Sequence, residues 1–109
     1  MLQSQYRLPA NIRLKNPSFF RAQYFSLKVG ENGLSQSRFA FVVRKSVDKR
    51  AVIRNRIKRV FRSCIEEMLG QIQEGKDMLF FLEKGIIDER HENLLEELKR
   101  IFADKKLLQ

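Results

Sequence analysis

The stretch KRAVIRNRIKRVFR, Lys49–Arg62, combines dense positive charge with regularly spaced apolar side chains. Seven of its fourteen residues are basic and none is acidic. On a helix, which advances roughly 100° per residue, Ile53, Ile57 and Phe61 fall on one side and most of the charges fall on the other. The stretch is therefore predicted to be an amphipathic helix that packs on a sheet and presents cations outward.

The limits of this helix are set by signals on either side of it. Asp48 is expected to cap its start, because a short acidic side chain can accept a backbone N–H there. The helix is expected to run from about Lys49 to near Leu69 or Gln71, where Gly70 favours an end.

Apolar runs outside the helix predict strands. RFAFVVR, Arg38–Arg44, carries apolar residues on both faces and is predicted to be a central strand. DMLFFLE, Asp77–Glu83, is predicted to be a buried strand parallel to it. A third strand is predicted at Tyr24–Val29, and the following Asn32-Gly33 pair is a hairpin signal. The crossover between the parallel strands is right-handed by default.

The two ends of the chain are predicted to be less regular. Met1–Asn16 is polar and interrupted by proline, which predicts an irregular segment or a poorly formed first turn of helix. Asp88 is expected to cap a last helix that ends at about Asp104, and Lys105–Gln109 is expected to fray. The order of elements predicts a single α/β (α+β) domain over residues 1–109, a two-layer sandwich with helices on one mixed sheet.

The excess positive charge is confined to one part of the chain. The formal net charge is +9, and Arg44–Arg62 alone accounts for +8, with nine basic residues and one acid, Asp48. Like charges four residues apart on a helix repel by about 0.2–0.5 kcal/mol per pair. A solvated helix would interleave acids, but here none follows until Glu66. The patch therefore predicts a polyanionic partner.

Composition argues against a membrane or secreted protein. A basic amphipathic helix can lie on anionic lipid, but this one stands between two buried strands and needs its apolar face for the core. No stretch approaches the roughly twenty apolar residues of a membrane span. Cys64 is the single cysteine, so no internal disulfide is expected. These features suit a cytoplasmic protein.

Candidate catalytic residues do not form a constellation. His91, the single histidine, falls on a polar position of the last predicted helix, and Cys64 falls on the core side of the basic one. Asp77, Glu83 and Asp88 could approach one another, but their spacing specifies no metal site. We therefore expect the protein itself to hold no catalytic site and no metal.

One run of residues resembles a known family. RNRIKR at Arg54–Arg59, preceded by VRK at Val43–Lys45 and KRA at Lys49–Ala51, resembles the signature of the protein subunit of bacterial ribonuclease P. The similarity is most specific from about Arg38 to Leu69 and continues loosely through the final helix. Tyr6–Leu8 resembles a short pattern near the start of the family.

The resemblance implies a fold and a function. The fold would have about four strands, like one domain of a small-subunit ribosomal protein, with a left-handed crossover through the basic helix. The chain would be the protein subunit of a ribonucleoprotein endoribonuclease. In such an enzyme the RNA subunit, with bound Mg²⁺, removes the 5′ leader of precursor tRNA, and the protein binds no cofactor. The protein would be a monomer in a one-to-one complex with ribonuclease P RNA and would also contact precursor tRNA.

The resemblance also carries over site residues by position. Arg54 or Arg56 could brace the helix against its neighbours instead of contacting RNA. The expected RNA-binding residues are Arg44, Lys45, Lys49, Arg50, Arg54, Asn55, Arg56, Lys58, Arg59 and Arg62.

A second implied site is a cleft for the single-stranded leader, between the first helix of the family and the sheet. The chain departs from the family pattern here, because Leu8–Phe20 is shorter and holds two prolines. Phe19, Phe20 and Tyr24 are the candidates for stacking on leader bases. Burial of the same aromatics in the core is the alternative interpretation.

Two other nucleic-acid functions remain as alternatives. A ribosomal or other structural RNA-binding protein would use the same patch with the same steep salt dependence, and the register of the motif alone separates it from the family above. A reader of double-stranded DNA would expose Asn, Gln or Ser side chains for base edges, and here Asn55 is nearly alone.

Overall fold

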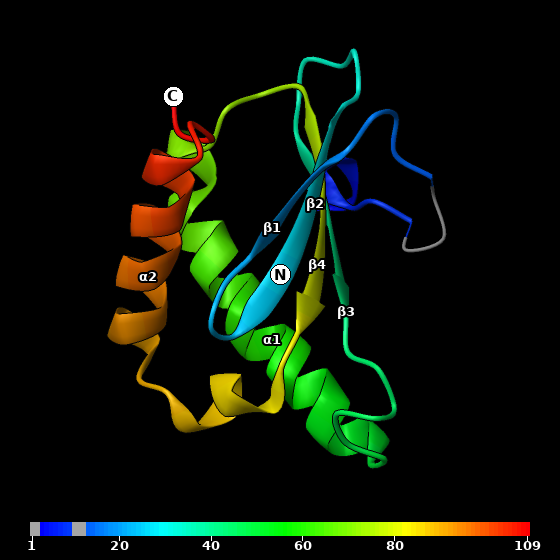
Figure 1. The fold of residues 1–109 in the computed structure, drawn as a ribbon, viewed down its shortest axis with the longest axis vertical. Coiled ribbons are helices and arrows are strands. Elements are labelled where there is room, and N and C mark those ends of the chain that lie inside the picture. The colour runs from blue at the N-terminus through cyan, green and yellow to red at the C-terminus, as the bar shows by residue number, and fades with distance from the viewer. Residues whose placement is uncertain (1–2, 10–12) are drawn as a thin grey trace.

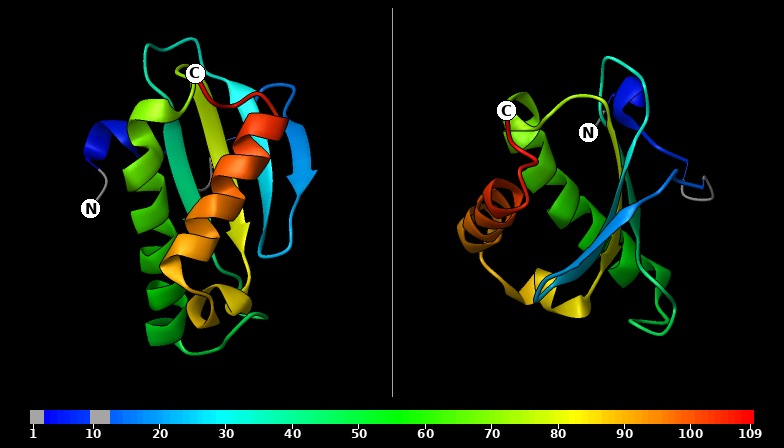
Figure 2. Two further views of the ribbon diagram at one scale, coloured as in Figure 1. Left: turned by 90° about the vertical axis from the view of Figure 1, so that its left-hand side faces the viewer. Right: turned by 45° about the horizontal axis from the view of Figure 1, so that its top comes forward.

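The computed structural model describes residues 3–9 and 13–109 (Figure 1). Its elements, with η for a 3₁₀ turn, are η1 Ser4–Tyr6, β1 Ser18–Arg21, β2 Phe25–Glu31, β3 Arg38–Val42, α1 Ala51–Met68, η2 Leu69–Gln71, β4 Lys76–Leu82, η3 Lys84–Asp88 and α2 His91–Asp104. Both helices lie on the same face of a four-stranded sheet (Figure 2). The predicted two-layer α/β sandwich is confirmed, and β1 is a strand that the sequence pattern did not reveal.

The sheet has the order β1-β2-β4-β3, so the last strand in the sequence is an inner one. β1 pairs with β2, and β2 with β4, in antiparallel fashion, whereas β3 and β4 are parallel and are joined through α1. In the left view of Figure 2 the helices face the viewer, both parallel strands point downward, and β4 lies to the right of β3. This crossover is left-handed, so the resemblance gave the correct handedness and the right-handed default was wrong.

β3 lies at an edge of the sheet, and its predicted central position was wrong. Its second apolar face is explained by the N-terminal segment. The Leu8 N–H donates to the Phe39 carbonyl at 2.8 Å, and Arg7 forms an isolated parallel bridge with Phe39. Leu8 also packs against Ala40 and Leu79 on the face of the sheet away from the helices. The start of the chain thus covers the place where a further strand would lie.

The Asn32-Gly33 pair forms a turn but not the predicted hairpin, because β4 separates β2 from β3. Gly33 has a φ of 70°, which glycine adopts without a steric cost. The Asn32 amide donates to the Gln36 carbonyl at 3.0 Å and to Asp77 Oδ1 at 2.9 Å. Asp77 also accepts two bonds from Arg38 at 2.9 and 2.7 Å. The loop is therefore fastened to the start of β4.

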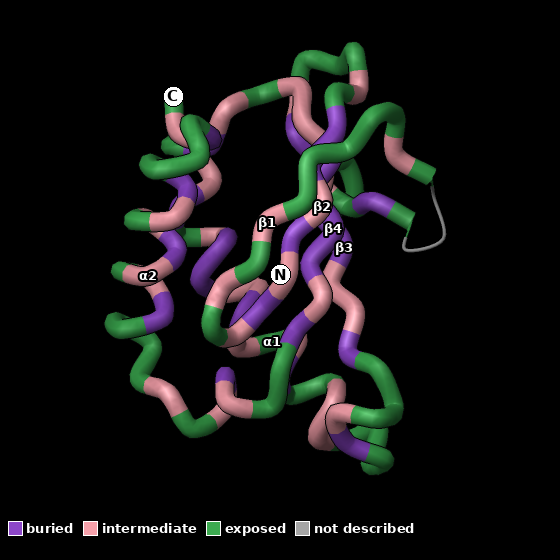
Figure 3. Tube along the Cα trace, in the orientation of Figure 1, coloured by how far each residue is buried: buried purple, intermediate pink, exposed green. Residues whose placement is uncertain are grey.

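The core lies between the sheet and the two helices (Figure 3). Phe61 of α1 and Phe80 of β4 are fully buried, with ring centroids 5.0 Å apart, and Phe25 packs against both. Phe102 of α2 also stacks on Phe80, with ring centroids 6.3 Å apart. Cys64 is buried on the inner face of α1, as predicted. Burying such rings contributes about 1.5–3 kcal/mol each to folding.

Both helices begin later than their predicted caps. The N-cap of α1 is Arg50 and that of α2 is Arg90, and neither cap side chain bonds to the helix. Asp48 accepts the Arg50 N–H at 2.9 Å and so orders the residue that precedes α1. Asp88 closes η3 two residues before the α2 cap.

The end of the chain is paired and does not fray as predicted. The Gln73 N–H donates to the Leu107 carbonyl at 2.7 Å, and the Gln109 N–H donates to the Gln71 carbonyl at 2.8 Å. Leu107 is also buried. The last residues therefore close over the segment between α1 and β4.

At the start of the chain, residues 1–2 and 10–12 of the predicted irregular segment lie outside the described residues. The described part of Met1–Asn16 holds one short turn, η1. No helix within the described residues has both the length and the apolar character that crossing a bilayer requires.

Candidate nucleic-acid interface

The outward side of α1 is a surface of cations. Arg56 and Arg59 are exposed and Lys58 is partly exposed. Within residues 3–9 and 13–109, none of these three side chains has a hydrogen-bond or ion-pair partner. Together with Asn55 and Arg62, Lys58 and Arg59 line a depression of about 480 Å³, whose lining Ser63 and Glu66 complete. We call Asn55, Arg56, Lys58, Arg59 and Arg62 the α1 ridge.

Two of the arginines within α1 that are predicted to bind RNA also contact other groups of the protein. Arg54 donates through Nη1 to the carbonyls of Asp48, at 3.0 Å, and Lys49, at 2.7 Å. Arg54 thus braces the start of α1, whereas Arg56 is exposed to solvent. The Arg62 guanidinium lies over the Phe41 ring, 5.9 Å from its centroid.

The start of α1 is organised by one buried carboxylate. Asp48 pairs with the Arg50 guanidinium at 2.9 Å and with Lys84 Nζ at 3.3 Å. These bonds hold the pKa of Asp48 well below its usual range. The predicted site residues Lys45 and Lys49 lie nearby in sequence and are exposed. The single acid of the basic segment therefore relieves repulsion at the start of α1 and pairs with none of Arg56, Lys58 and Arg59.

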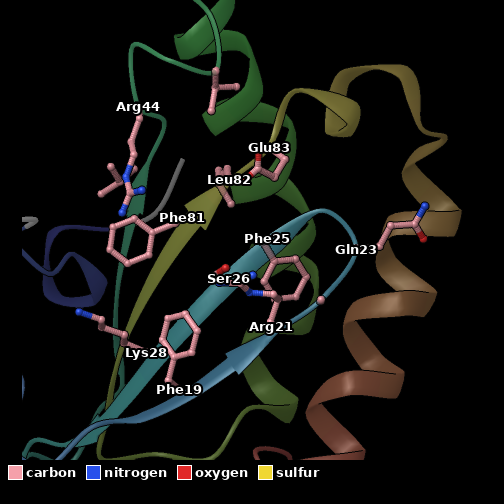
Figure 4. A pocket seen from close by; sticks show the side chains of 13 residues that line it. Phe19, Arg21, Gln23, Phe25, Ser26, Lys28, Arg44, Phe81, Leu82 and Glu83 are labelled. Atoms are coloured by element: carbon pink, nitrogen blue, oxygen red, sulfur yellow. The ribbon is translucent and has the colours of Figure 1, made fainter.

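The face of the sheet opposite the helices forms a second surface. The strand register places Phe19 beside Lys28, and Arg21 beside Ser26, which neighbours Phe81. These residues line a cleft of about 740 Å³ (Figure 4), which we call the open-face cleft. Phe19 is 52% exposed.

Cations surround the aromatic surface of this cleft. The Arg44 guanidinium lies 5.0 Å from the centroid of the Phe81 ring, and Lys28 Nζ lies 5.8 Å from it. Exposed rings can stack on bases, and nearby cations can hold phosphates. Sequence reasoning included Arg44 but missed Arg21, Lys28 and Phe81. The Phe80-Phe81 pair could have revealed Phe81. Adjacent residues of a strand face opposite sides of the sheet, so one of the two rings had to point away from the helices.

The three predicted leader-stacking aromatics do not come together. Phe19 lines the open-face cleft, whereas Phe20 packs against the core on the helix side with Lys105 Nζ 5.3 Å from its centroid. The Tyr24 hydroxyl donates to Glu89 Oε2 at 2.6 Å, which raises the pKa of Tyr24 and lowers that of Glu89. Tyr24 therefore fastens the β1–β2 turn to the start of α2.

The acidic residues considered for metal binding do not assemble. Asp77 is at the start of β4 with Arg38, and Glu83 follows the end of the same strand. Across the part of the chain that the structure describes, no three His, Cys, Asp or Glu side chains are placed to share a metal ion.

Cys64 and His91 are neighbours, with Sγ 3.6 Å from Nδ1, and His91 Nε2 also contacts Glu67. Burial raises the pKa of Cys64 to about 11. The Cys64 thiol is therefore protonated at neutral pH and is a poor nucleophile.

Comparison with known proteins identifies related sequences. The family model for ribonuclease P matches residues 11–106. The ribonuclease P protein component of Synechocystis sp. is 30% identical over 93% of this chain and 90% of its own length. The corresponding protein of Pseudanabaena sp. is 32% identical over 82% of this chain and 78% of its own length.

Solved structures show the same fold. The RNase P protein from Staphylococcus aureus aligns with a TM-score of 0.73 at 20% identity, covering 95% of this chain and 98% of that one. The RNase P protein from Thermotoga maritima, in complex with 1-(4-fluorophenyl)-2-thiourea, aligns with a TM-score of 0.69 at 23% identity, covering 79% and 83%.

Proposed function

The chain belongs to the ribonuclease P protein family, and from that premise we propose that the α1 ridge binds the catalytic RNA and that the open-face cleft binds the 5′ leader of precursor tRNA. Because the chain is a protein component of ribonuclease P, its partner is the ribonuclease P RNA. The observation that carries the proposal is the set of unpaired cations on α1.

The α1 ridge suits a folded RNA. Arg56, Lys58 and Arg59 lack carboxylate partners among the described residues, so RNA phosphates need not compete with internal ion pairs. Their mutual repulsion is relieved when phosphates bind and counterions leave the RNA. Because the opposite side of α1 is buried in the core, the ridge is held in place before RNA arrives. Little conformational entropy is then lost on binding.

The open-face cleft suits a single strand. Stacking on an exposed ring such as Phe19 tolerates any base, and Lys28, Arg44 and Arg21 can follow the phosphates. A duplex would present phosphates but no unstacked base for the ring. The leader of precursor tRNA is single-stranded, so this surface fits it without requiring a particular sequence.

We assign the hydrolysis and its magnesium ions to the RNA subunit. The contribution of the protein is electrostatic: it neutralises phosphates of catalyst and substrate and holds the leader on one side of the complex. We further propose one protein monomer per RNA, acting in the cytoplasm on precursor tRNA. The protein itself then needs no catalytic group.

Reconstitution tests this function. The protein is added to ribonuclease P RNA and a precursor tRNA, and leader removal is measured at low and high magnesium. We expect strong stimulation at low magnesium and weak stimulation at high magnesium, because the ions can then replace part of the neutralising charge. Tight binding to ribosomal RNA without any stimulation of cleavage would favour a structural RNA-binding protein instead.

A further inference from the structure

The open-face cleft continues around the edge of the sheet. A second depression, of about 280 Å³, shares Arg21 and Gln23 with the cleft and reaches α2. Figure 4 shows Gln23 at the turn between β1 and β2, on the side of α2. The second depression shares Phe20 and Lys105 with a third, of about 540 Å³. The second and third depressions therefore extend the cleft around β1, and we call them together the β1 groove.

The far end of the β1 groove is rich in lysine. Lys76 pairs with Glu31, and Lys105 lies 3.6 Å from an Asp104 oxygen. Lys15 and Lys106 line the same depression, and neither side chain has a hydrogen-bond or ion-pair partner in the described ranges 3–9 and 13–109. Two lysine side chains without partners thus lie at the end of a path that begins at the aromatic cleft and passes Arg21 and Arg100 as well as the carboxylates of Glu97 and Asp104.

The backbone is strained at this same place. Asn16 has a φ of 42° and Lys106 a φ of 59°, and they are the non-glycine residues with positive φ among those the structure describes. Both line the lysine-rich depression. Where a helix ends with a residue in this left-handed conformation, that residue is most often glycine, because a Cβ atom makes the conformation sterically unfavourable.

The helix dipole does not account for Lys106. A cation near the C-terminus of α2 is favourable, but a lysine in the last turn would give the same benefit without strain. Strain that stability does not explain is typical of residues kept for binding. Phe20, under Lys105, adds an aromatic face beside these cations.

We propose that the β1 groove is a second subsite for single-stranded RNA, and that it holds leader nucleotides farther from the cleavage site than those in the open-face cleft. This inference rests on the proposed function. A strand that leaves the cleft can pass the β1–β2 turn through the shared residues and reach Lys15 and Lys106. The subsite binds the negatively charged phosphates of the RNA backbone. Its contribution to affinity should therefore depend on the length of the leader and not on its sequence.

The test uses the reconstituted holoenzyme and precursor tRNAs with a short or a long leader. The variant Lys15→Gln with Lys106→Gly removes both free cations, and glycine at position 106 relieves the strain, so the fold is preserved. The matched control is Arg90→Gln with Lys99→Gln, which removes two cations that do not line the groove.

We expect the Lys15/Lys106 variant to bind the long-leader substrate about 5- to 10-fold more weakly at low salt. Its slope of log K against log salt should be smaller by about 0.7 per lysine removed. Binding of the short-leader substrate should not change, and the control should behave as the unmodified protein. Equal affinity of variant and unmodified protein for the long leader, or equal losses for both leaders, would overturn the proposal.

Two further measurements separate the possible failures. Stimulation of cleavage by the unmodified protein at low magnesium reports on the proposed function. If that stimulation is seen but the Lys15/Lys106 variant binds the long leader normally, only the proposal about the β1 groove is overturned. Thermal unfolding of the Lys15/Lys106 variant checks its fold. If the melting temperature of the double variant falls, the single variant Lys106→Gly replaces it in the comparison. The single variant removes one cation, so half the change in salt slope is expected.

Discussion

The two helices have similar inner faces and opposite outer faces. Both pack on the same side of the sheet, through Phe61 in α1 and Phe102 in α2. α1 carries five basic residues before its first acid, Glu66, whereas α2 mixes four acids with Lys99 and Arg100. The fold needs only the inner half of each helix, so the outer half is free to vary. One-sided charge on that free half is therefore evidence of a function.

The starts of the two helices make the same point on a smaller scale. A carboxylate orders each start: Asp48 before α1 and Glu89 before α2. Asp48 pairs with two cations, Arg50 and Lys84. Glu89 accepts bonds from the Tyr24 hydroxyl, the Asn93 amide and a backbone N–H. The two helices are thus anchored alike, but only the anchor of α1 lies among basic residues.

The largest expected effect tests whether the inner faces are equivalent. Phe61→Ala and Phe102→Ala each remove a fully buried ring. Each should lower the free energy of unfolding by about 3–5 kcal/mol, from lost burial and the cavity left behind. Urea unfolding followed by circular dichroism measures both. A loss at one position several times that at the other would mean that the helices do not share one core.

The next effect tests whether the outer faces differ in function. Replacing Arg56, Lys58 and Arg59 together with Ala should weaken binding to ribonuclease P RNA by about 1 kcal/mol or more per contact, on the order of 100-fold in total. Filter binding at fixed salt measures it. Stability should hold or rise slightly, because like charges are removed from one helix.

The control for the outer faces removes cations at the cap of α2 and within it. Arg90→Ala with Lys99→Ala removes two cations where the α1 variant removes three, and it should change RNA affinity by less than about twofold, apart from the general effect of net charge. A loss as large as that of the α1 variant would show that total charge, and not the α1 ridge, determines binding.

The smallest effect concerns the two anchors. Because the folded-state pKa of Asp48 and of Glu89 lies below the ordinary value, each stabilises the fold above that ordinary value. This stability is lost as the pH falls through the folded-state pKa. Asp48→Asn and Glu89→Gln should each make the free energy of unfolding depend less steeply on pH below about pH 4. Urea unfolding from pH 2 to 7 measures this dependence. High salt should reduce the Asp48 effect more, since its partners are mainly charged.

Local patterns in the sequence predicted local structure well. The spacing of Ile57, Phe61 and Ile65 predicted both α1 and its buried side, and the run Asp77–Glu83 predicted β4. The outward position of Arg56 and Arg59 followed from the same helical spacing. These features depend on residues a few positions apart, where periodicity gives direct information.

Non-local features were not predictable in the same way. Both apolar faces of β3 suggested a central strand, but the contact of Leu8 with Phe39 joins residues far apart in sequence. The Asn32-Gly33 pair correctly predicted a turn, but it carried no information that β4 would lie between β2 and β3. The open-face cleft depends on this strand order, because Lys28 meets Phe81 only after β4 pairs with β2.

The strand order also determines when the domain can fold during synthesis. β4 is the common partner of β2 and β3, yet it is the last strand that the ribosome makes. Its pairing joins Phe25 to Leu82, so most of the chain must emerge before the sheet can close. Contacts of such long sequence separation fold slowly and together. Until β4 has emerged, a newly made chain therefore lacks the strand against which the apolar side of α1, with Ile57 and Phe61, is buried.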